Sequence, residues 1–335
     1  MPNSDHKLNK SYLITGGTGS IGSEIARSLI ASGAKKLTIF SRDDSKQFYL
    51  QEELGYKKNI RFILGDIRDR DSLSVAFEEP IDCVIHAAAL KHVLICEQNP
   101  AEAVRTNILG TQNVVDLAKR AQVEKMITIS TDKAVNPSST MGASKYVAEK
   151  LTLDGNSTGK TKYACVRFGN VLGSRGSVIP NMYKSISEKN CLWISDSKVT
   201  RFAMPIPEAS KLVIDALANC QGGEIFVLKM KAFVLGQLAE AFREVLSPGA
   251  DFKVETRGII GAEKMHEELV SSEEAKRLWE TEDHYVIEPI RGSWSPEKSM
   301  SEAKIELFNS VDAEKFGGTE LQVFINNYIS SLNIQ

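Results

Sequence analysis

The sequence has no long hydrophobic run, little net charge and few cysteines, and each absence excludes a class of protein. No apolar segment approaches the roughly 20 residues that a membrane-crossing helix needs, and residues 1–10 are polar where a secretory signal has an apolar core. The 41 Lys and Arg residues nearly balance the 43 Asp and Glu residues, so the formal charge of −2 gives no general attraction to nucleic acid or anionic lipid. We therefore expect a cytoplasmic protein that binds neither membranes nor nucleic acid.

Cysteine and histidine are too scattered to suggest a metal site. None of the five cysteines belongs to a Cys-x-x-Cys motif, and the five histidines never show metal-ligand spacing. We expect no bound metal and no disulfide framework, with most cysteines buried as small hydrophobic residues.

What the sequence does have is a 42% hydrophobic content over 335 residues and a regular alternation of strands and helices in its first half. Apolar strands are predicted at 11–15, 36–40, 61–64, 83–87 and 126–130, each separated from the next by a stretch long enough for a crossover helix. This alternation predicts an α/β fold with a doubly wound parallel (Rossmann) sheet, covered by helices on both faces.

The alternation weakens after about Gly169, where a short apolar piece at 224–228 lies between helical runs near 208–218 and 235–245. We predict a nucleotide-binding domain over residues 1–170. Residues 171–335 are expected to form mainly a smaller α/β substrate-binding lobe, with some segments returning to the first domain. No long linker separates the two parts, so we expect them to pack together.

A glycine-rich stretch, TGGTGSIG at 15–22, lies between the first predicted strand and a helical pattern. Small residues there let the chain turn sharply, let a pyrophosphate approach the N–H groups at the helix start, and let the helix pack close to the sheet. We predict dinucleotide binding by this loop. Its candidate binding residues are Gly16, Thr18, Gly19, Ser20, Ile21 and Gly22.

The end of the second strand bears on whether the dinucleotide is NADP or NAD. An acidic residue there would bind the ribose 2′-hydroxyl of NAD, whereas this strand ends with Ser41 and Arg42, which suit a 2′-phosphate. We favour NADP, while the neighbouring Asp43 leaves NAD open. Asp66, after the third strand, either caps the adenine amino group or forms the N-cap of the helix that follows.

Polar residues close the fifth predicted strand. Thr131, Asp132 and Lys133 follow it directly, and Lys145 comes on the next helix. Clusters of Asp and Lys are usually solvated, but open α/β sheets place their chemistry at the carboxyl edge of the strands. We therefore predict catalytic roles for these residues.

Several motifs together resemble the extended short-chain dehydrogenase/reductase superfamily and, more closely, the UDP-N-acetylglucosamine 4,6-dehydratases of polysaccharide and nonulosonate biosynthesis. They read HAAALKHV at 86–93, STDKAVNP at 130–137, RFGNV at 167–171 and SRGSVIP at 174–180. The resemblance runs from about residue 10 to residue 290, and the Asp-Lys pair distinguishes this family from relatives with Asp-Glu.

One position departs from the superfamily pattern, which has Tyr-x-x-x-Lys where this chain reads MGASK at 141–145. The thioether of Met141 cannot carry a proton, so it cannot be the usual acid/base. The resemblance includes a methionine-bearing branch of dehydratases, which favours another proton acceptor over an inactive enzyme. Tyr146 lies about 100° around the helix and is not expected to substitute.

The resemblance implies that hydride leaves sugar C4 for the cofactor, that water is eliminated across C5 and C6, and that the hydride returns to C6. In this hypothesis Asp132, through Thr131 or water, takes the 4-hydroxyl proton and later protonates the departing 6-hydroxyl. Lys133, if desolvated enough to be neutral, removes the C5 proton, and Lys145 stays cationic at the nicotinamide ribose. Whether C5 is inverted is left open.

Further candidate residues accompany the resemblance. The additional cofactor-binding candidates are Ile67, Ala87, Ala88, Ala89, Lys91, Asn107 and Lys145, and the UDP-sugar candidates are Lys91, Asn170, Arg175, Val178, Pro180, Arg201, Arg257 and Glu263. The resemblance also implies a homo-oligomer, with a hexamer built from dimers as one form, assembled through helices near 100–120 and 142–153.

Two other functions remain open. A nucleotide-sugar 4-epimerase or simple oxidoreductase on the same fold has no need for a C5 base at Lys133, and normally retains the tyrosine replaced by Met141. A catalytically silent NADP-binding sensor would explain the missing tyrosine, but nothing would require it to keep Asp132 and Lys145.

Overall fold

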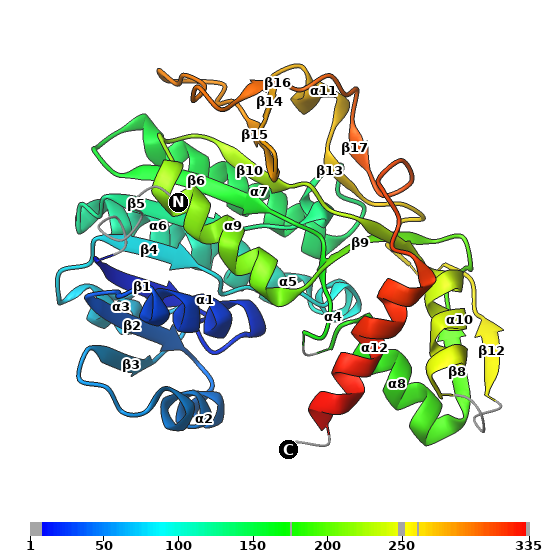
Figure 1. The fold of residues 1–335 in the computed structure, drawn as a ribbon. Helices are drawn as coiled ribbons and strands as arrows, with labels where there is room; N and C mark the ends of the chain where they lie inside the picture. The colour runs from blue at the N-terminus through cyan, green and yellow to red at the C-terminus, as the bar shows by residue number, and fades with distance from the viewer. Residues whose placement is uncertain (1–8, 175, 247–251, 260, 333–335) are drawn as a thin grey trace.

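The computed structural model describes residues 9–174, 176–246, 252–259 and 261–332, and its centre is a ten-stranded sheet (Figure 1). The strand order is β16-β14-β15-β10-β6-β5-β4-β1-β2-β3. Strands β1 to β6 run parallel, and β1 to β5 lie at or within one residue of the five predicted positions. They are β1 (Ser11–Thr15), β2 (Lys36–Ser41), β3 (Ile60–Leu64), β4 (Cys83–His86), β5 (Lys125–Ile129) and β6 (Lys162–Arg167). The predicted α/β fold is confirmed.

Part of the region after residue 170 extends this sheet. Strand β10 (Ile225–Leu228) pairs parallel with β6, whereas β15 (His284–Ile287), β14 (Leu278–Glu280) and β16 (Ser301–Glu302) continue the sheet in antiparallel pairing. The sheet is therefore mixed at one edge, which the parallel pattern of the first half does not predict.

Helices cover both faces of the sheet because successive strand residues point to opposite sides. On β1, Ile14 belongs to a core cluster with Ile25 of α1 (Ser20–Ala31), and α9 (Ile206–Asn219) packs beside α1. The neighbouring Leu13 belongs to a second cluster with Val114 of α6 (Gly110–Arg120), next to which lies α7 (Thr140–Asp154).

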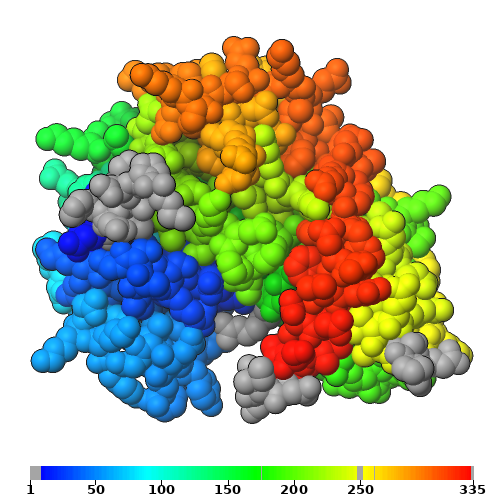
Figure 2. All heavy atoms as spheres, viewed as in Figure 1, coloured from blue at the N-terminus to red at the C-terminus, as the bar shows by residue number. Residues whose placement is uncertain are grey.

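A smaller lobe with its own core lies beside one end of the sheet (Figures 1 and 2). Helix α12, drawn in red, packs against the yellow α10, and strands β8 and β12 pair in parallel. The lobe contains α8 (Val178–Lys189), β8 (Cys191–Ile194), α10 (Leu235–Leu246), β12 (Lys253–Thr256) and α12 (Gly318–Leu332).

Shorter elements complete the fold. They are α2 (Asp44–Leu54), α3 (Arg70–Ser74), η1 (Val75–Phe77), α4 (Val93–Gln98), α5 (Pro100–Ala103), η2 (Val104–Leu109), η3 (Asp132–Ala134), η4 (Gly155–Ser157), β7 (Asn170–Val171), β9 (Thr200–Met204), β11 (Ala232–Val234), β13 (Glu268–Val270), α11 (Ser272–Ala275) and β17 (Phe308–Asn309). The five cysteines are buried, as predicted. Within the described ranges, no helix is both long enough and apolar enough to cross a membrane.

Candidate active site

A cavity of about 690 Å³ opens at the carboxyl ends of the parallel strands. This is the position at which open α/β sheets bind ligands. The cavity gathers most of the residues that the sequence singles out. The predicted residues that line it are Gly16, Thr18, Gly19, Ser20, Ile21, Gly22, Ser41, Arg42, Asp66, Ile67, Ala87, Ala88, Ala89, Lys91, Thr131, Lys133, Met141, Lys145 and Asn170.

The glycine loop packs closely against the segment after β4 and against the start of α1, which only glycine permits. Gly16 has a φ of 69°, and a Cβ added there would lie 2.7 Å from the Cα of Ala88. A Cβ added at Gly22 would lie 2.5 Å from the carbonyl oxygen of Gly16. Helix α1 begins at Ser20 beside the cavity, and its N-cap Gly19 makes no side-chain hydrogen bond, which is the arrangement of a phosphate-binding helix start. These features fit a dinucleotide.

The turn after β2 and the first turn of α2 each carry one cation. Arg42 and Lys46 both line the cavity, and Lys46 was not singled out by the sequence analysis. The carboxylate of Asp43 accepts a hydrogen bond from the Lys46 backbone N–H at 2.9 Å, which caps α2, and it also pairs with the Lys46 ammonium. Asp43 is thus engaged by the helix start. The position of Lys46 in the first turn after the strand is the signal that could have identified it.

Asp66 lies at the cavity wall, where it accepts hydrogen bonds from the backbone N–H of Arg68 at 3.0 Å and from its guanidinium at 2.7 Å. Burial alone would raise the pKa of this carboxyl, but the contacts with Arg68 lower it. The N-cap of α3 is Asp69, so the alternative prediction that Asp66 caps the following helix is wrong.

Asn107 does not line this cavity, although the sequence analysis proposed it as a cofactor ligand. Its amide accepts a hydrogen bond from the Leu90 N–H at 2.8 Å and donates to the Leu90 carbonyl at 3.0 Å and to the Ser144 hydroxyl at 2.9 Å. The side chain is almost fully buried. It therefore ties the segment after β4 to α7.

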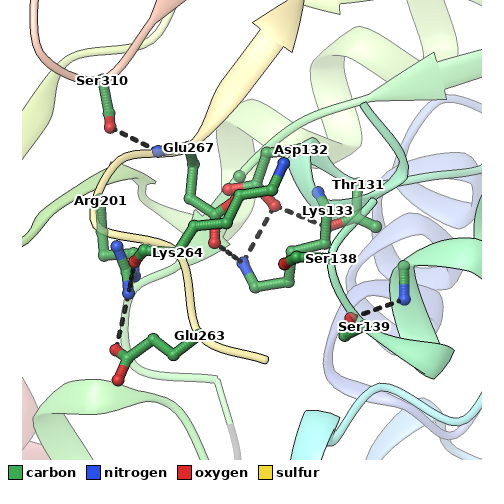
Figure 3. Close-up of polar contacts among 12 residues, drawn as sticks. Thr131, Asp132, Lys133, Ser138, Ser139, Arg201, Glu263, Lys264, Glu267 and Ser310 are labelled. Atoms are coloured by element: carbon green, nitrogen blue, oxygen red, sulfur yellow. Dashed lines mark hydrogen bonds and ion pairs between the residues drawn. The ribbon is translucent and has the colours of Figure 1, made fainter. Parts of the chain in front are cut away.

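The residues after β5 form a compact polar group (Figure 3). The Thr131 hydroxyl donates to Oδ1 of Asp132 at 2.7 Å, and the Lys133 ammonium donates to the same oxygen at 3.1 Å. Thr131 and Lys133 line the cavity, whereas Asp132 has no exposed surface. A proton can therefore pass between the cavity and Asp132 through the Thr131 hydroxyl.

A second carboxylate, which the sequence analysis did not assign to the catalytic group, also contacts Lys133. Oε1 of Glu267 lies 3.4 Å from the Lys133 ammonium, and the Glu267 side chain is 3% exposed. Burial opposes a charge on Lys133, but Asp132 and Glu267 raise its pKa above the ordinary value. The two carboxylates therefore favour the charged form of Lys133. Desolvation alone does not meet the condition of the hypothesis above, that Lys133 be neutral.

Lys145 and Met141 occupy one face of α7, whose N-cap Ser139 accepts a hydrogen bond from the Gly142 N–H at 3.0 Å. The Lys145 ammonium donates to the carbonyl of Ile129 at 2.6 Å. Burial lowers the pKa of Lys145, against the opposing effect of Glu149. Met141 is buried in a small apolar cluster and offers no proton to the cavity.

A second cavity of about 430 Å³ shares Asn170 with the first, and Val178, Arg201 and Glu263 also line it. The Arg201 guanidinium donates to Glu263 at 2.6 Å and to the carbonyls of Lys264 and Thr200 at 2.8 Å each. Two predicted substrate residues are thus paired with each other. By contrast, Oδ1 of Asn170 is buried without a hydrogen-bond partner in the described part of the chain.

The remaining substrate candidates are placed differently. Arg175 lies outside the described residues. Pro180 is in the first turn of α8 and lines neither cavity. Arg257 is exposed, and its guanidinium lies over the ring of Trp193, which lines the second cavity. Across the described ranges, no three His, Cys, Asp or Glu side chains are arranged to hold a metal ion.

This chain is similar to known proteins over most of its length. The family described as "Polysaccharide biosynthesis protein" matches residues 12–289. A protein of Methanocaldococcus jannaschii named "Uncharacterized membrane protein MJ1061" is 46% identical over 91% of this chain and 92% of its own length. The UDP-N-acetylglucosamine 4,6-dehydratase (inverting) of Campylobacter jejuni is 40% identical over 84% of this chain and 83% of its own.

Other relatives carry a different activity name. A protein of Rickettsia conorii named UDP-glucose 4-epimerase is 40% identical over 85% of this chain and 84% of its own length. Among solved structures, Pen from Bacillus thuringiensis is 39% identical, with a TM-score of 0.89 over 95% of this chain and 98% of its own.

Proposed function

Because this chain belongs to the polysaccharide biosynthesis protein family, whose relatives include nucleotide-sugar dehydratases and epimerases, we propose that it is a UDP-N-acetylglucosamine 4,6-dehydratase. The product is a UDP-4-keto-6-deoxy-N-acetylhexosamine. The observation that carries this proposal is the contact of Lys133 with Asp132 at the cavity wall, because elimination of water needs a base for the C5 proton and 4-epimerisation does not.

A nicotinamide cofactor bound in the first cavity would supply a reversible hydride acceptor, and the glycine loop after β1 and Lys145 would hold it there. Thr131 accepts the 4-hydroxyl proton while its own proton passes to Asp132, over the 2.7 Å hydrogen bond between them. Lys133 removes the C5 proton. Asp132 then protonates the departing 6-hydroxyl through the same relay, and Lys133 returns a proton to C5 when hydride reaches C6. The sugar thus loses one water and the protein groups end as they began. Lys145 holds the cofactor ribose and polarises the reacting oxygen.

We propose NADP as the cofactor and keep NAD as the alternative. Arg42 and Lys46 supply cations on the cavity wall beyond β2, where a 2′-phosphate would lie. The Asp43 carboxylate, which would otherwise favour a ribose hydroxyl, is occupied by the start of α2 and by Lys46. Competitive titration with both dinucleotides tests this assignment.

We propose a homo-oligomer that assembles through α4, η2 and α7. These elements pack together and expose large apolar side chains, which soluble monomers rarely gather in one patch. The exposed residues are Leu94, Ile95, Val104, Leu109, Tyr146 and Val147. A measured mass in solution equal to one chain of 36.9 kDa at micromolar concentration would reject this proposal, and a mass of six chains would match the hexamer.

The test of the proposed activity uses UDP-N-acetylglucosamine in deuterated water, followed by proton NMR. A 6-deoxy-4-keto sugar with solvent deuterium at C5 is the expected product, and the C5 coupling constants report inversion or retention. An epimerised sugar that keeps its 6-hydroxyl would instead assign the enzyme to the 4-epimerases. An unchanged sugar, with NADP or NAD supplied and with other nucleotide sugars tried, would favour the silent sensor.

A further inference from the structure

Glu267 is the buried carboxylate that the reaction above leaves without a role. It lies just before β13, on the segment formed by residues 261–268, far along the chain from the Asp-Lys pair. Oε1 contacts the Lys133 ammonium at 3.4 Å, while Oε2 is buried without a hydrogen-bond partner in the described ranges. A buried carboxylate with an oxygen that lacks a donor is costly, and neutralising it with a proton on either oxygen would lower that cost.

The 261–268 segment is fixed against the loop after β5 (Figure 3). The Lys264 ammonium donates to the carbonyl of Val135 at 2.7 Å, and the Ser138 hydroxyl donates to the carbonyl of Ala262 at 2.9 Å. On its other side, the Glu267 backbone N–H donates to the Ser310 hydroxyl at 2.9 Å. The position of the Glu267 carboxylate beside Lys133 is therefore set by contacts on two sides.

The charges around Glu267 bear on where a proton can rest. Lys133 and Asp132 face it from η3, Arg201 faces it from β9, and Lys264 lies on its own segment. Burial raises the pKa of Glu267, and Asp132 adds to that effect, while the three cations oppose it. Glu267 is therefore a better proton acceptor than an ordinary surface carboxylate.

The order of the proton transfers indicates what Glu267 does in the proposed reaction. At rest, Asp132 and Glu267 together hold Lys133 in its charged form, in which it cannot act as a base. When the 4-hydroxyl proton reaches Asp132, one of the two negative charges disappears. Only Glu267 then holds the charge on Lys133, so moving a proton from Nζ of Lys133 to Oε1 of Glu267 becomes easier.

We propose that Glu267 accepts the Lys133 proton after Asp132 has been neutralised, and so releases Lys133 as the C5 base only once C4 is oxidised. This proposal rests on the proposed dehydratase function. The amine then takes the C5 proton, the C5–H electrons form the C5–C6 double bond as the C6–O bond breaks, and Asp132 supplies the proton that turns the leaving hydroxide into water. When Lys133 later returns its proton to C5, Glu267 returns its own proton to Lys133. Glu267 is a positioning residue that acts through Lys133.

The test compares Glu267→Gln with Glu268→Gln over a range of pH, after wild type has been shown to form the 6-deoxy-4-keto sugar. Glu268 is the matched control because it is the next residue and accepts a hydrogen bond from Asn136 of the same loop at 2.7 Å. In wild type the reactive and resting forms of the Lys133–Glu267 pair hold the same number of protons. The dehydration rate should therefore be nearly independent of pH around neutrality.

In Glu267→Gln, neutral Lys133 forms only by losing a proton to solvent. Dehydration at neutral pH should fall on the order of 100-fold and then rise about tenfold per pH unit. C4 oxidation, followed in a single turnover by the absorbance of the reduced nicotinamide, should persist. Glu268→Gln should keep the wild-type profile. Glu267→Asp, which keeps the carboxylate, should restore the flat profile at a reduced rate.

Three outcomes would overturn the proposal. The first is a Glu267→Gln enzyme with a flat pH profile and a rate within about threefold of wild type. The second is equal loss of C4 oxidation and dehydration, which would indicate general damage to the site. The third is a Glu267→Asp enzyme with the sloping profile. A wild-type enzyme that forms no dehydrated sugar would instead reject the proposed function itself.

Discussion

Replacing Arg167 with Met should destabilise the protein strongly, because Arg167 is a buried cation that holds three parts of the fold together. It lies on β6 and is 1% exposed. Its guanidinium makes five hydrogen bonds, of which two go to Glu149 of α7, two go to Glu274 of α11 and one goes to the carbonyl of Leu269. Methionine has a similar length and would fill much of the space, so the main loss is the charge.

The magnitude follows from the environment of Glu149. That carboxylate has no exposed surface, and Arg167 is its only ion-pair partner in the described part of the chain. Removing one partner of a buried ion pair costs about 3–5 kcal/mol, because the other charge is left uncompensated. Against a typical free energy of unfolding of roughly 5–15 kcal/mol, this is a large fraction.

The assay is urea unfolding at neutral pH of wild type, Arg167→Met and the double variant Arg167→Met/Glu149→Gln. The double variant should recover stability relative to Arg167→Met, because it no longer buries an unpaired charge at Glu149. A single variant within about 1 kcal/mol of wild type would refute the reasoning, as would a double variant less stable than the single one.

The same ion pairs predict part of the acid sensitivity. Burial opposes ionisation of Glu274, but Arg167 dominates and lowers the pKa of Glu274 to about 2. Since this folded-state pKa is below the unfolded value of about 4.3, the stabilisation is present above pH ~4.3 and is lost as the pH falls toward ~2. In Arg167→Met this contribution to the acid dependence should disappear.

The other predictions concern the two ends of the first cavity. Lys133→Met should retain bound cofactor and C4 oxidation while dehydration falls about 10²- to 10⁴-fold, and near-normal turnover would contradict the role of Lys133. Arg42→Ala should weaken NADP binding about tenfold more than NAD binding in parallel titrations, whereas equal losses would remove the argument for a 2′-phosphate site. Gly22→Ala places a Cβ 2.5 Å from the Gly16 carbonyl oxygen, so the loop must shift. Cofactor affinity should then fall at least about tenfold, and an unchanged dissociation constant would contradict this prediction.

The sequence predicts the sheet and its glycine loop well because both depend on local patterns. The apolar runs that became β1 to β5 are short and bounded by polar segments, and the strand-glycine-helix order is contained within residues 11–31. Ligands bind at the carboxyl edge of a parallel sheet, so Thr131, Lys133 and Lys145 can be predicted to share one cavity before any tertiary contact is known.

The features that the sequence does not predict depend on residues far apart in the chain. Asn107 has the polarity of a ligand-binding residue, but its hydrogen-bonding groups serve Leu90 and Ser144. The antiparallel edge of the sheet is made by β14, β15 and β16, which have 3, 4 and 2 residues and so carry too short a pattern to predict. Glu267 follows no spacing rule relative to Lys133, because the two meet only when the chain after β12 returns across the loop after β5.

The charge state of Lys133 shows why position alone does not determine chemistry. From the sequence, a lysine at the edge of a buried sheet suggests a desolvated neutral amine, since burial favours the uncharged form. In the structure, Asp132 and Glu267 lie beside the buried Lys133 ammonium. Their combined attraction raises the pKa of Lys133 by more than desolvation lowers it. In the proposed reaction, Lys133 must therefore be released as a base by removing negative charge, and oxidation at C4 is the step that brings a substrate proton to Asp132. Under this proposal, the charges around Lys133 protect the substrate from premature loss of the C5 proton without any movement of the chain.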